Sequence, residues 1–363
     1  MNALPAHPAA PPPGEGAGAR PLDGYFFEDY RVGRAFVHAT PRTLTPGDAA
    51  LYHALTGARQ IAHCSLPAAR ALGHRDMPLD DLLVFHMAFG KTVADISYNA
   101  VANLGYADVR FLHPVYPGDT LRAESQVIGV KENSDGRNGI VYVRSNAFNQ
   151  DERNVLTWVR WVMVAKRDPA APAPPKSIPE LPALVASTAL AVPDFLKPRA
   201  LDPVETGGTR RFEDYAAGQV IDHPGGMTLD ESDHTLAAKL YQNTARVHFD
   251  ARHMAATPFG RRLVYGGHVI SVCRALAYDG LENVISIAAI NAGTHVNATY
   301  AGDTLYAKSI VLDGWPLSAD LGALRLRMLG LKDAEPGSVA APLGAPPASV
   351  VLDLDYTVLM PRR

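Results

Sequence analysis

The pattern of hydrophobic and polar positions predicts the same succession of elements twice along the chain. In the first half, helices are expected over residues 48–55 and 82–97, followed by strands over 108–115, 120–130, 139–149 and 154–166. In the second half, helices are expected over 231–241 and 266–278, followed by strands over 291–300, 304–312, 324–332 and 349–359. The helices at 82–97 and 266–278 are apolar on nearly every side, which predicts that both are buried.

The predicted strands alternate between apolar and polar residues, most clearly over 157–162 and 352–356. A period of two is typical of a strand that packs one face against a core. The pattern therefore predicts an α+β fold, in which each half wraps antiparallel strands around one buried helix.

Two sequence blocks recur in the same order and indicate an internal duplication. The tetrapeptide Phe27-Glu28-Asp29-Tyr30 returns at residues 212–215, an offset of 185, and the same offset pairs His63 with His248. A second block, residues 116–121, is similar to residues 300–305 at an offset of 184. Self-similarity at a nearly constant offset indicates one fold written twice.

Proline-rich stretches set the expected domain limits. We expect a disordered arm over 1–22, a first domain over 23–168, an extended linker over 169–203 and a second domain over 204–363. Residues 334–349 are expected to form a long loop between two strands.

Composition narrows the class of protein. With 363 residues, 47% hydrophobic and 20% charged, the chain can bury a sizeable core, and its net charge of −3 argues against a nucleic-acid-binding protein. Two cysteines exclude a disulfide framework and a cysteine-based zinc site, and no histidine pair has a spacing that predicts a metal site. Neither a secretory signal nor a membrane-spanning run is evident, so we expect a cytoplasmic protein without membrane contact.

The segment 243–271 carries the candidate chemistry, and it resembles the hydratase motif of the MaoC-like (R)-specific enoyl-CoA hydratases. The matching positions are His248, Asp250, Pro258-Phe259-Gly260 and Gly266. Two positions depart from the family pattern: Asn243 stands where the family has its catalytic Asp, and Tyr265 replaces a His. In the first copy Ala58 occupies the Asp position, while His63 is retained.

The resemblance extends over residues 23–168 and 205–332, through strings such as LTGARQIAHCS and DDLLVFHMAFGKTV. It implies a double hotdog fold and a hydro-lyase that reversibly hydrates an enoyl-CoA. Mesaconyl-CoA (2-methylfumaryl-CoA) and β-methylmalyl-CoA are the expected substrate and product. Coenzyme A would be part of the substrate, and no cofactor is implied.

In the family that the chain resembles, an Asp and a His hold a water between them, and one polarises the water while the other handles the proton. An Asn side chain can orient a water but cannot accept a proton at neutral pH, so His248 would carry the acid–base work and Asn243 would position the water. A carboxylate from elsewhere, such as Asp250, is the alternative. His63 is the equivalent candidate in the first copy.

Glycines and arginines complete the candidate site. Gly266 and Gly267 begin a buried helix, whose unpaired N–H groups could stabilise a thioester oxygen as it becomes enolate-like, with Tyr265 just before them. Arg59 or Arg246 could bind a substrate carboxylate. Arg261 and Arg262 could meet the phosphates of coenzyme A.

Two other functions stay open at this point. Hotdog folds also host acyl-CoA thioesterases. The loss of both catalytic Asp residues, at Ala58 and Asn243, is also compatible with a non-catalytic acyl-CoA-binding protein. The sequence leaves open whether the chain forms a homo-oligomer.

Overall fold

The computed structural model describes residues 20–340 and 346–363. The disordered arm expected over 1–22 therefore lies almost wholly outside the described residues. So does the centre of the loop expected over 334–349.

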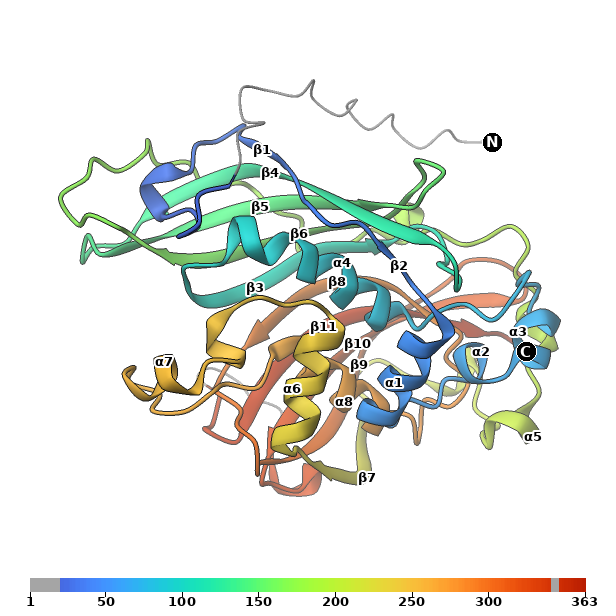
Figure 1. The fold of residues 1–363 in the computed structure, drawn as a ribbon. Coiled ribbons are helices and arrows are strands. Elements are labelled where there is room, and N and C mark those ends of the chain that lie inside the picture. The colour runs from blue at the N-terminus through green and yellow to red at the C-terminus, as the bar shows by residue number, and fades with distance from the viewer. Residues whose placement is uncertain (1–19, 341–345) are drawn as a thin grey trace.

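The first half contains a long helix and four long strands (Figure 1). Its helices are η1 (Phe27–Asp29), α1 (Pro46–Thr56), α2 (Ile61–Cys64), α3 (Leu66–Ala71) and α4 (Asp81–Ile96). Its strands are β1 (Ala35–Val37), β2 (Arg42–Thr43), β3 (Ala100–Phe111), β4 (Thr120–Glu132), β5 (Asn138–Phe148) and β6 (Asn154–Ala165).

The second half repeats this plan. Its helices are η4 (Phe212–Asp214), α6 (Glu231–Leu240), η5 (Arg246–His248), α7 (Ala251–Ala255), α8 (Gly266–Leu276) and η6 (Pro336–Ser338). Its strands are β7 (Val220–Thr228), β8 (Ser286–His295), β9 (Thr304–Pro316), β10 (Leu321–Lys332) and β11 (Val350–Pro361). The duplication inferred from the sequence is thus visible as two copies of one arrangement.

Between the halves, the chain forms only short elements: η2 (Ser187–Ala189), η3 (Pro198–Ala200) and α5 (Pro203–Thr206). A single bridge joins Ser177 to Val130 on β4. Leu190 and Leu196 of this connector pack against a small apolar cluster that includes Ala62 and Leu72. The cluster also contains Ile285 and Leu359 of the second half, and the Val185 N–H of the connector donates to Asn291 at 2.9 Å, so the connector packs against both halves.

The two halves share one antiparallel sheet in the order β1-β4-β5-β6-β3-β8-β11-β10-β9-β7, with β2 paired to β4 at the side. The seam is the β3–β8 pair, where Tyr106 is opposite Gly293 and Ala107 is opposite Ala292. Because each half places its long helix against this sheet, the structure confirms the predicted α+β double hotdog architecture.

Helices α4 and α8 meet at the centre of the molecule. His86 Nε2 on α4 is hydrogen-bonded at 3.1 Å to Ser271 Oγ on α8, and these residues are related by the repeat offset of 185. The largest apolar core draws on both halves. Both helices are buried as predicted, and both pack into this shared core.

The helix starts differ in a way that bears on function. Thr45 caps α1 through a capping box with Asp48, and the Asp80 side chain caps α4 by accepting from the Leu82 N–H at 2.9 Å. Tyr265 occupies the N-cap position of α8, and its side chain makes no capping hydrogen bond. The amino end of α8 is therefore left without a side-chain acceptor.

The predicted bounds of the two seam strands were wrong. β3 begins at Ala100 rather than at residue 108, and β8 begins at Ser286 rather than at residue 291. Small residues at the start of both strands give no apolar–polar alternation. They are extended because residues 100–105 pair with β6 and residues 286–287 pair with β11, and backbone pairing does not depend on the side-chain pattern.

Candidate active site

A cavity of about 300 Å³ lies between the two halves, and both contribute to its walls. Phe89, Val93, Tyr106 and Arg160 come from the first half and are all buried, so they form its floor. Val101 and Phe259 are 45% and 41% exposed, and they mark its mouth. The volume is in the range of small-molecule sites.

His248 is held in one tautomer at the wall of this cavity. It ends the short helix η5, and its Nδ1 donates to the backbone oxygen of Leu263 at 2.9 Å. Burial lowers the pKa of His248 to about 4, so the ring is neutral at pH 7. A neutral ring with a protonated Nδ1 leaves Nε2 as a proton acceptor.

Asn243 lines the same cavity and is 2% exposed. Its side-chain oxygen accepts from the Ala245 N–H at 3.0 Å, so the loop is folded around this oxygen. The NH₂ group is then the part of the side chain that can donate to a water. Asn243 and His248, predicted from one motif, are brought together as expected.

The amino end of α8 faces the cavity through Gly266. A Cβ atom placed on Gly266 would lie 2.3 Å from His295 Nε2, so only glycine allows this approach. Gly267 lies differently: a Cβ there would meet Tyr265 and the His86 ring on α4. Gly266 therefore lines the cavity at the start of α8, whereas Gly267 packs between helices.

Tyr265 also lines the cavity, at the position where the family has a His. Its ring meets the His248 ring edge-on, with 5.4 Å between the ring centroids. Its hydroxyl is buried without a hydrogen-bond partner among the described residues, and burial raises its pKa well above 10. The hydroxyl is thus a neutral donor beside the catalytic candidate.

Three further residues of this site were missed by sequence reasoning. His295 of β8 and Tyr106 of β3 are hydrogen-bonded across the seam, with 3.2 Å between His295 Nε2 and the Tyr106 hydroxyl. Arg160 of β6 is 0% exposed and lies at the cavity floor. The buried face of β6 carries Trp158, Arg160 and Val162 at alternate positions. A charged residue on an otherwise apolar strand face was therefore the sequence signal that could have identified Arg160.

The structure does not bring Arg59 or Arg246 into the cavity. The Arg59 side chain is 55% exposed and pairs with Asp279 at 3.1 Å. Arg246 is exposed and donates to the Tyr98 hydroxyl at 2.9 Å. The assignment of a substrate carboxylate to either residue therefore has no geometric support.

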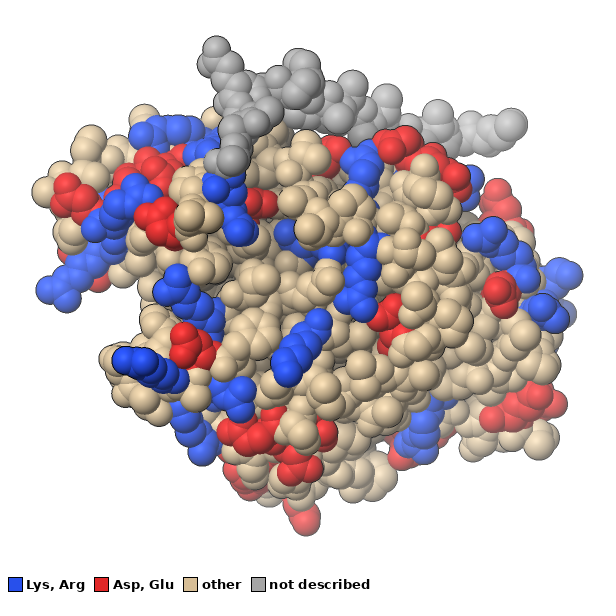
Figure 2. Space-filling view, viewed as in Figure 1, with Lys and Arg blue, Asp and Glu red and all other residues tan. Residues whose placement is uncertain are grey.

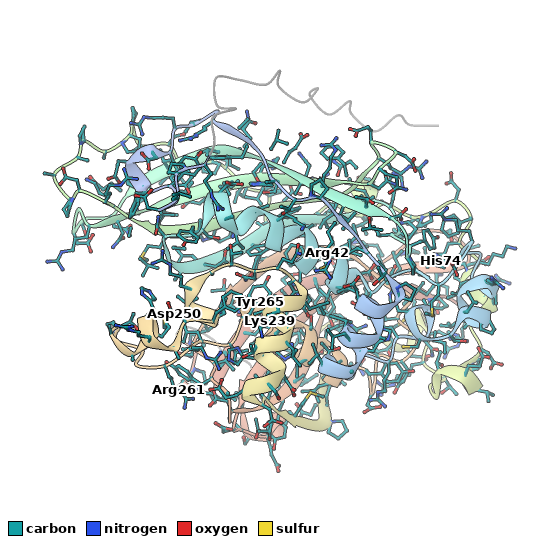
Figure 3. All side chains as sticks on the ribbon, in the orientation of Figure 1. Arg42, His74, Lys239, Asp250, Arg261 and Tyr265 are labelled. Carbon is teal, nitrogen blue, oxygen red and sulfur yellow. The ribbon has the colours of Figure 1, made fainter. Side chains whose placement is uncertain are left out.

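Asp250 and Arg262 have structural contacts instead of cavity contacts. Asp250 caps α7 by accepting from the His253 N–H at 2.9 Å, and Arg262 is paired with Glu231 of α6. Arg261 is exposed and lies over the Tyr300 ring at 4.1 Å. Figure 3 shows Tyr265 near the centre of the molecule, with Asp250 and Arg261 toward its edge.

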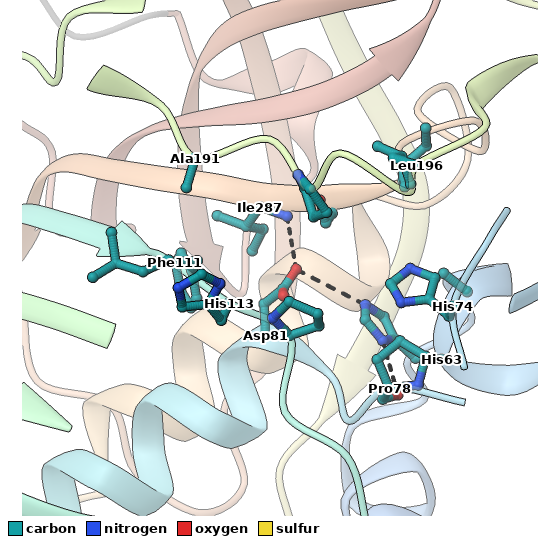
Figure 4. Close-up of a pocket in the computed structure, with 15 residues that line it drawn as sticks. His63, His74, Pro78, Asp81, Phe111, His113, Ala191, Leu196 and Ile287 are labelled. Carbon is teal, nitrogen blue, oxygen red and sulfur yellow. Dashed lines mark hydrogen bonds and ion pairs between the residues drawn. The ribbon is translucent and has the colours of Figure 1, made fainter. Parts of the chain in front are cut away.

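His63 lies at a separate and smaller cavity of about 50 Å³, which is lined by residues of the first half, the connector and the start of β8 (Figure 4). Its Nδ1 is 3.2 Å from the Pro78 oxygen, and its Nε2 is 3.8 Å from a carboxylate oxygen of Asp81. Asp81 also accepts from the Ile287 N–H at 2.7 Å. The structure therefore does not bring His63 together with His248.

Within residues 20–340 and 346–363, no group of three or more His, Cys, Asp and Glu side chains is arranged to hold a metal ion. In the same part of the chain, no helix is both long enough and apolar enough to cross a bilayer.

The fold and this site define a MaoC-like double hotdog protein. Residues 28–148 match the model of the MaoC like domain. A crystal structure of a MaoC domain protein dehydratase from Chloroflexus aurantiacus superimposes with a TM-score of 0.92 at 50% identity, covering 95% of this chain and 100% of that one. A Mycobacterium tuberculosis protein described as a double hotdog fold gives a TM-score of 0.77 at 26% identity, covering 94% and 99%.

Two curated relatives narrow this class. The chain is 52% identical to mesaconyl-CoA hydratase of Cereibacter sphaeroides, over 93% of this chain and 98% of the relative. It is 51% identical to β-methylmalyl-CoA dehydratase of Chloroflexus aurantiacus, over 95% and 99%. The chain therefore belongs to the MaoC-like family of hydratases and dehydratases that includes these two enzymes.

Proposed function

We propose that this protein reversibly hydrates mesaconyl-CoA to β-methylmalyl-CoA, as a hydro-lyase without a cofactor. The observation that carries the proposal is the convergence, in one cavity, of a neutral His248 with a fixed tautomer and an uncapped helix start at Gly266. The relatives' names supply the substrate pair.

In the hydration direction, the thioester oxygen lies at the Gly266 N–H. His248 Nε2 takes a proton from water as the water oxygen bonds to the carbon that bears the free carboxylate. The electron pair of the double bond moves onto the thioester, and the resulting enolate oxygen is stabilised by the helix N–H and dipole.

The same imidazolium then returns its proton to the carbon beside the thioester. An imidazolium is costly in this buried place when the site is empty, as the lowered pKa of His248 shows. Beside an enolate the charges pair, so the cation forms only where the reaction needs it. Because one ring takes the proton from water and delivers it to carbon, the hydroxyl and the proton add to the same face of the double bond.

Asn243 and the exposed arginine have supporting roles. The NH₂ group of Asn243 donates to the water oxygen, so that one water proton can point to His248 while the other stays on the hydroxyl that forms. Arg261 lies beside the loop that supplies Phe259 and Leu263 to the cavity, so it can meet a coenzyme A phosphate outside the mouth. Figure 2 shows Lys and Arg side chains over the face that carries α6 and α7.

A product assay tests the proposal. The purified chain is incubated with mesaconyl-CoA, with crotonyl-CoA as the comparison substrate, and both enoyl-thioester absorbance and free thiol are followed. Loss of absorbance without thiol release, with β-methylmalyl-CoA as product, is the expected result. Thiol release would identify a thioesterase, and binding without turnover would identify a non-catalytic acyl-CoA-binding protein.

A further inference from the structure

Arg160 is a fully buried arginine that no acidic side chain neutralises within the described part of the chain. Its Nη2 donates to Thr92 Oγ1 at 2.9 Å, and its Nη1 donates to Ser97 Oγ at 3.2 Å. Its guanidinium carbon lies 4.2 Å from the centre of the Phe89 ring. All these partners are neutral, so the positive charge is hydrogen-bonded but not paired.

An unpaired buried charge is costly for the folded state. Burial lowers the pKa of Arg160 to about 10, so the guanidinium is still protonated at neutral pH. Its Nε is buried without a hydrogen-bond partner among the described residues. Taking one such ion out of water costs several kcal/mol unless an opposite charge repays it. Uncompensated charges of this kind mark sites that a ligand completes.

The position of Arg160 shows which end of a ligand it would meet. It is directly opposite Tyr106 in the β3–β6 ladder. The Tyr106 hydroxyl contacts His295, and His295 lies against Gly266. A ligand that enters past Phe259 and puts its thioester at Gly266 would therefore point the far end of its acyl group toward the floor, where Arg160 lies.

We propose that Arg160 binds the free carboxylate of the acyl group and makes the site selective for enoyl-CoA thioesters that carry one. The inference rests on the proposed function in placing the thioester at Gly266. It gives Arg160 the role that the sequence suggested for Arg59 or Arg246. A carboxylate would pair with the guanidinium in a site of low dielectric, whereas an uncharged acyl end would leave the cation unpaired.

A second buried arginine provides an internal contrast. Arg274 of α8 is 4% exposed and lines a small cavity of about 10 Å³ together with Asp80 and Asp81. Burial alone therefore does not leave an arginine without carboxylates in this fold. The cavity at Arg274 is lined by carboxylate side chains of the protein, and the cavity at Arg160 is not.

The primary test compares two neutral variants, Arg160→Met and Arg160→Gln, with Arg59→Leu as the control at an exposed arginine. We expect the ratio of kcat/KM for mesaconyl-CoA to kcat/KM for crotonyl-CoA to fall by roughly 100- to 1000-fold in both neutral variants. Arg59→Leu should leave the ratio unchanged. The Tm of Arg160→Met should equal or exceed that of the wild type, because a buried unpaired charge is removed.

A binding measurement separates this inference from the proposed reaction. Methylsuccinyl-CoA and butyryl-CoA are saturated thioesters that cannot be hydrated, and only the first has a free carboxylate. Calorimetric titration should show that the wild type prefers methylsuccinyl-CoA and that Arg160→Met and Arg160→Gln lose this preference. Loss of the preference supports the role of Arg160 even if the wild type hydrates neither enoyl-CoA.

Either of two results would overturn the inference. One is a folded neutral variant that keeps the wild-type preference for the carboxylated thioester. The other is an equal loss of affinity for methylsuccinyl-CoA and butyryl-CoA, which would show that Arg160 only shapes the cavity. The two neutral variants differ in polarity, so that Gln can keep hydrogen bonds to Thr92 and Ser97 if Met disturbs the fold.

Discussion

The two copies of the fold place a histidine in the same frame but surround it with opposite chemistry. His63 and His248 both bring Nδ1 to a backbone oxygen fifteen residues further on, that of Pro78 and that of Leu263. At the first residue of the long helix that follows, the first copy has Asp81 and the second copy has Gly266. In the first copy a carboxylate lies at the helix start, and in the second the glycine has no side chain and the His295 ring lies against it.

The two buried arginines, Arg274 and Arg160, also differ in their surroundings. Arg274 shares its small cavity with Asp80, Asp81 and Gln60, and in the amide orientation that pairs donors with acceptors Gln60 accepts from Arg274 at 2.8 and 2.9 Å. Arg160 has only neutral partners at the floor of the larger cavity. Duplication followed by divergence has thus made one site self-contained and left the other to be completed by a ligand.

The largest expected effect comes from removing each histidine in turn. His248→Ala should lower kcat for mesaconyl-CoA hydration by about 10³-fold, because a positioned acid–base group contributes on this scale. The matched His63→Ala variant should change kcat by less than about threefold, because its ring lies at the other cavity. Steady-state kinetics on folded variants checks this. The reverse order would place the active half in the first copy.

The open helix start is tested by adding one methyl group. Gly266→Ala should lower kcat by about 100-fold, because the new Cβ would collide with His295 Nε2 and cover the donor to the thioester oxygen. The equivalent first-copy variant, Asp81→Ala, should keep wild-type kcat. Comparable losses in the two variants would show that the two helix starts are not functionally different.

The Asp that the family has in its hydratase motif can be restored in either copy, at Asn243 or at Ala58. A carboxylate in Asn243→Asp should raise the pKa of His248 above its value of about 4, moving the acid limb of the kcat/KM profile up by about one pH unit. Ala58→Asp adds the same group to the first copy and should leave the profile unchanged. A pH–rate series decides between these outcomes, and equal shifts would argue against His248 as the titrating base.

The smallest effect concerns stability at the self-contained site. Burial raises the pKa of Asp81 from 3.8 to about 6, with His63 opposing the shift. The stability that this group contributes is therefore fully present below pH 3.8 and lost as the pH rises through about 6.

Asp81→Asn keeps an acceptor for the Ile287 N–H but cannot ionise, so this variant does not lose that stability as the pH rises. Relative to the wild type, its free energy of unfolding should increase by about 2 kcal/mol between pH 4 and pH 7. Urea unfolding at both pH values measures this difference. A variant that becomes relatively less stable at pH 7 would show that the ionised carboxylate stabilises the first-copy site.

Much of the fold was predictable, because hydrophobic periodicity and a repeated offset report on local structure and ancestry. The buried helices α4 and α8 followed from apolar runs, and His248 and Gly266 followed from a motif within one segment. The starts of β3 and β8 were not predictable, because their small residues give no alternating pattern and are extended through pairing with the neighbouring strands β6 and β11.

The sequence by itself determined the duplication, the paired histidines and a glycine at a helix start, since each is a property of neighbouring residues or of a fixed offset. Only the tertiary structure decided that His248, His295 and Arg160 share a cavity, because they lie in three elements that meet where the copies join. It also decided which arginine lacks an anion. Whether a buried charge is paired depends on which residues surround it in the folded protein, and the spacing of residues along the chain does not show this.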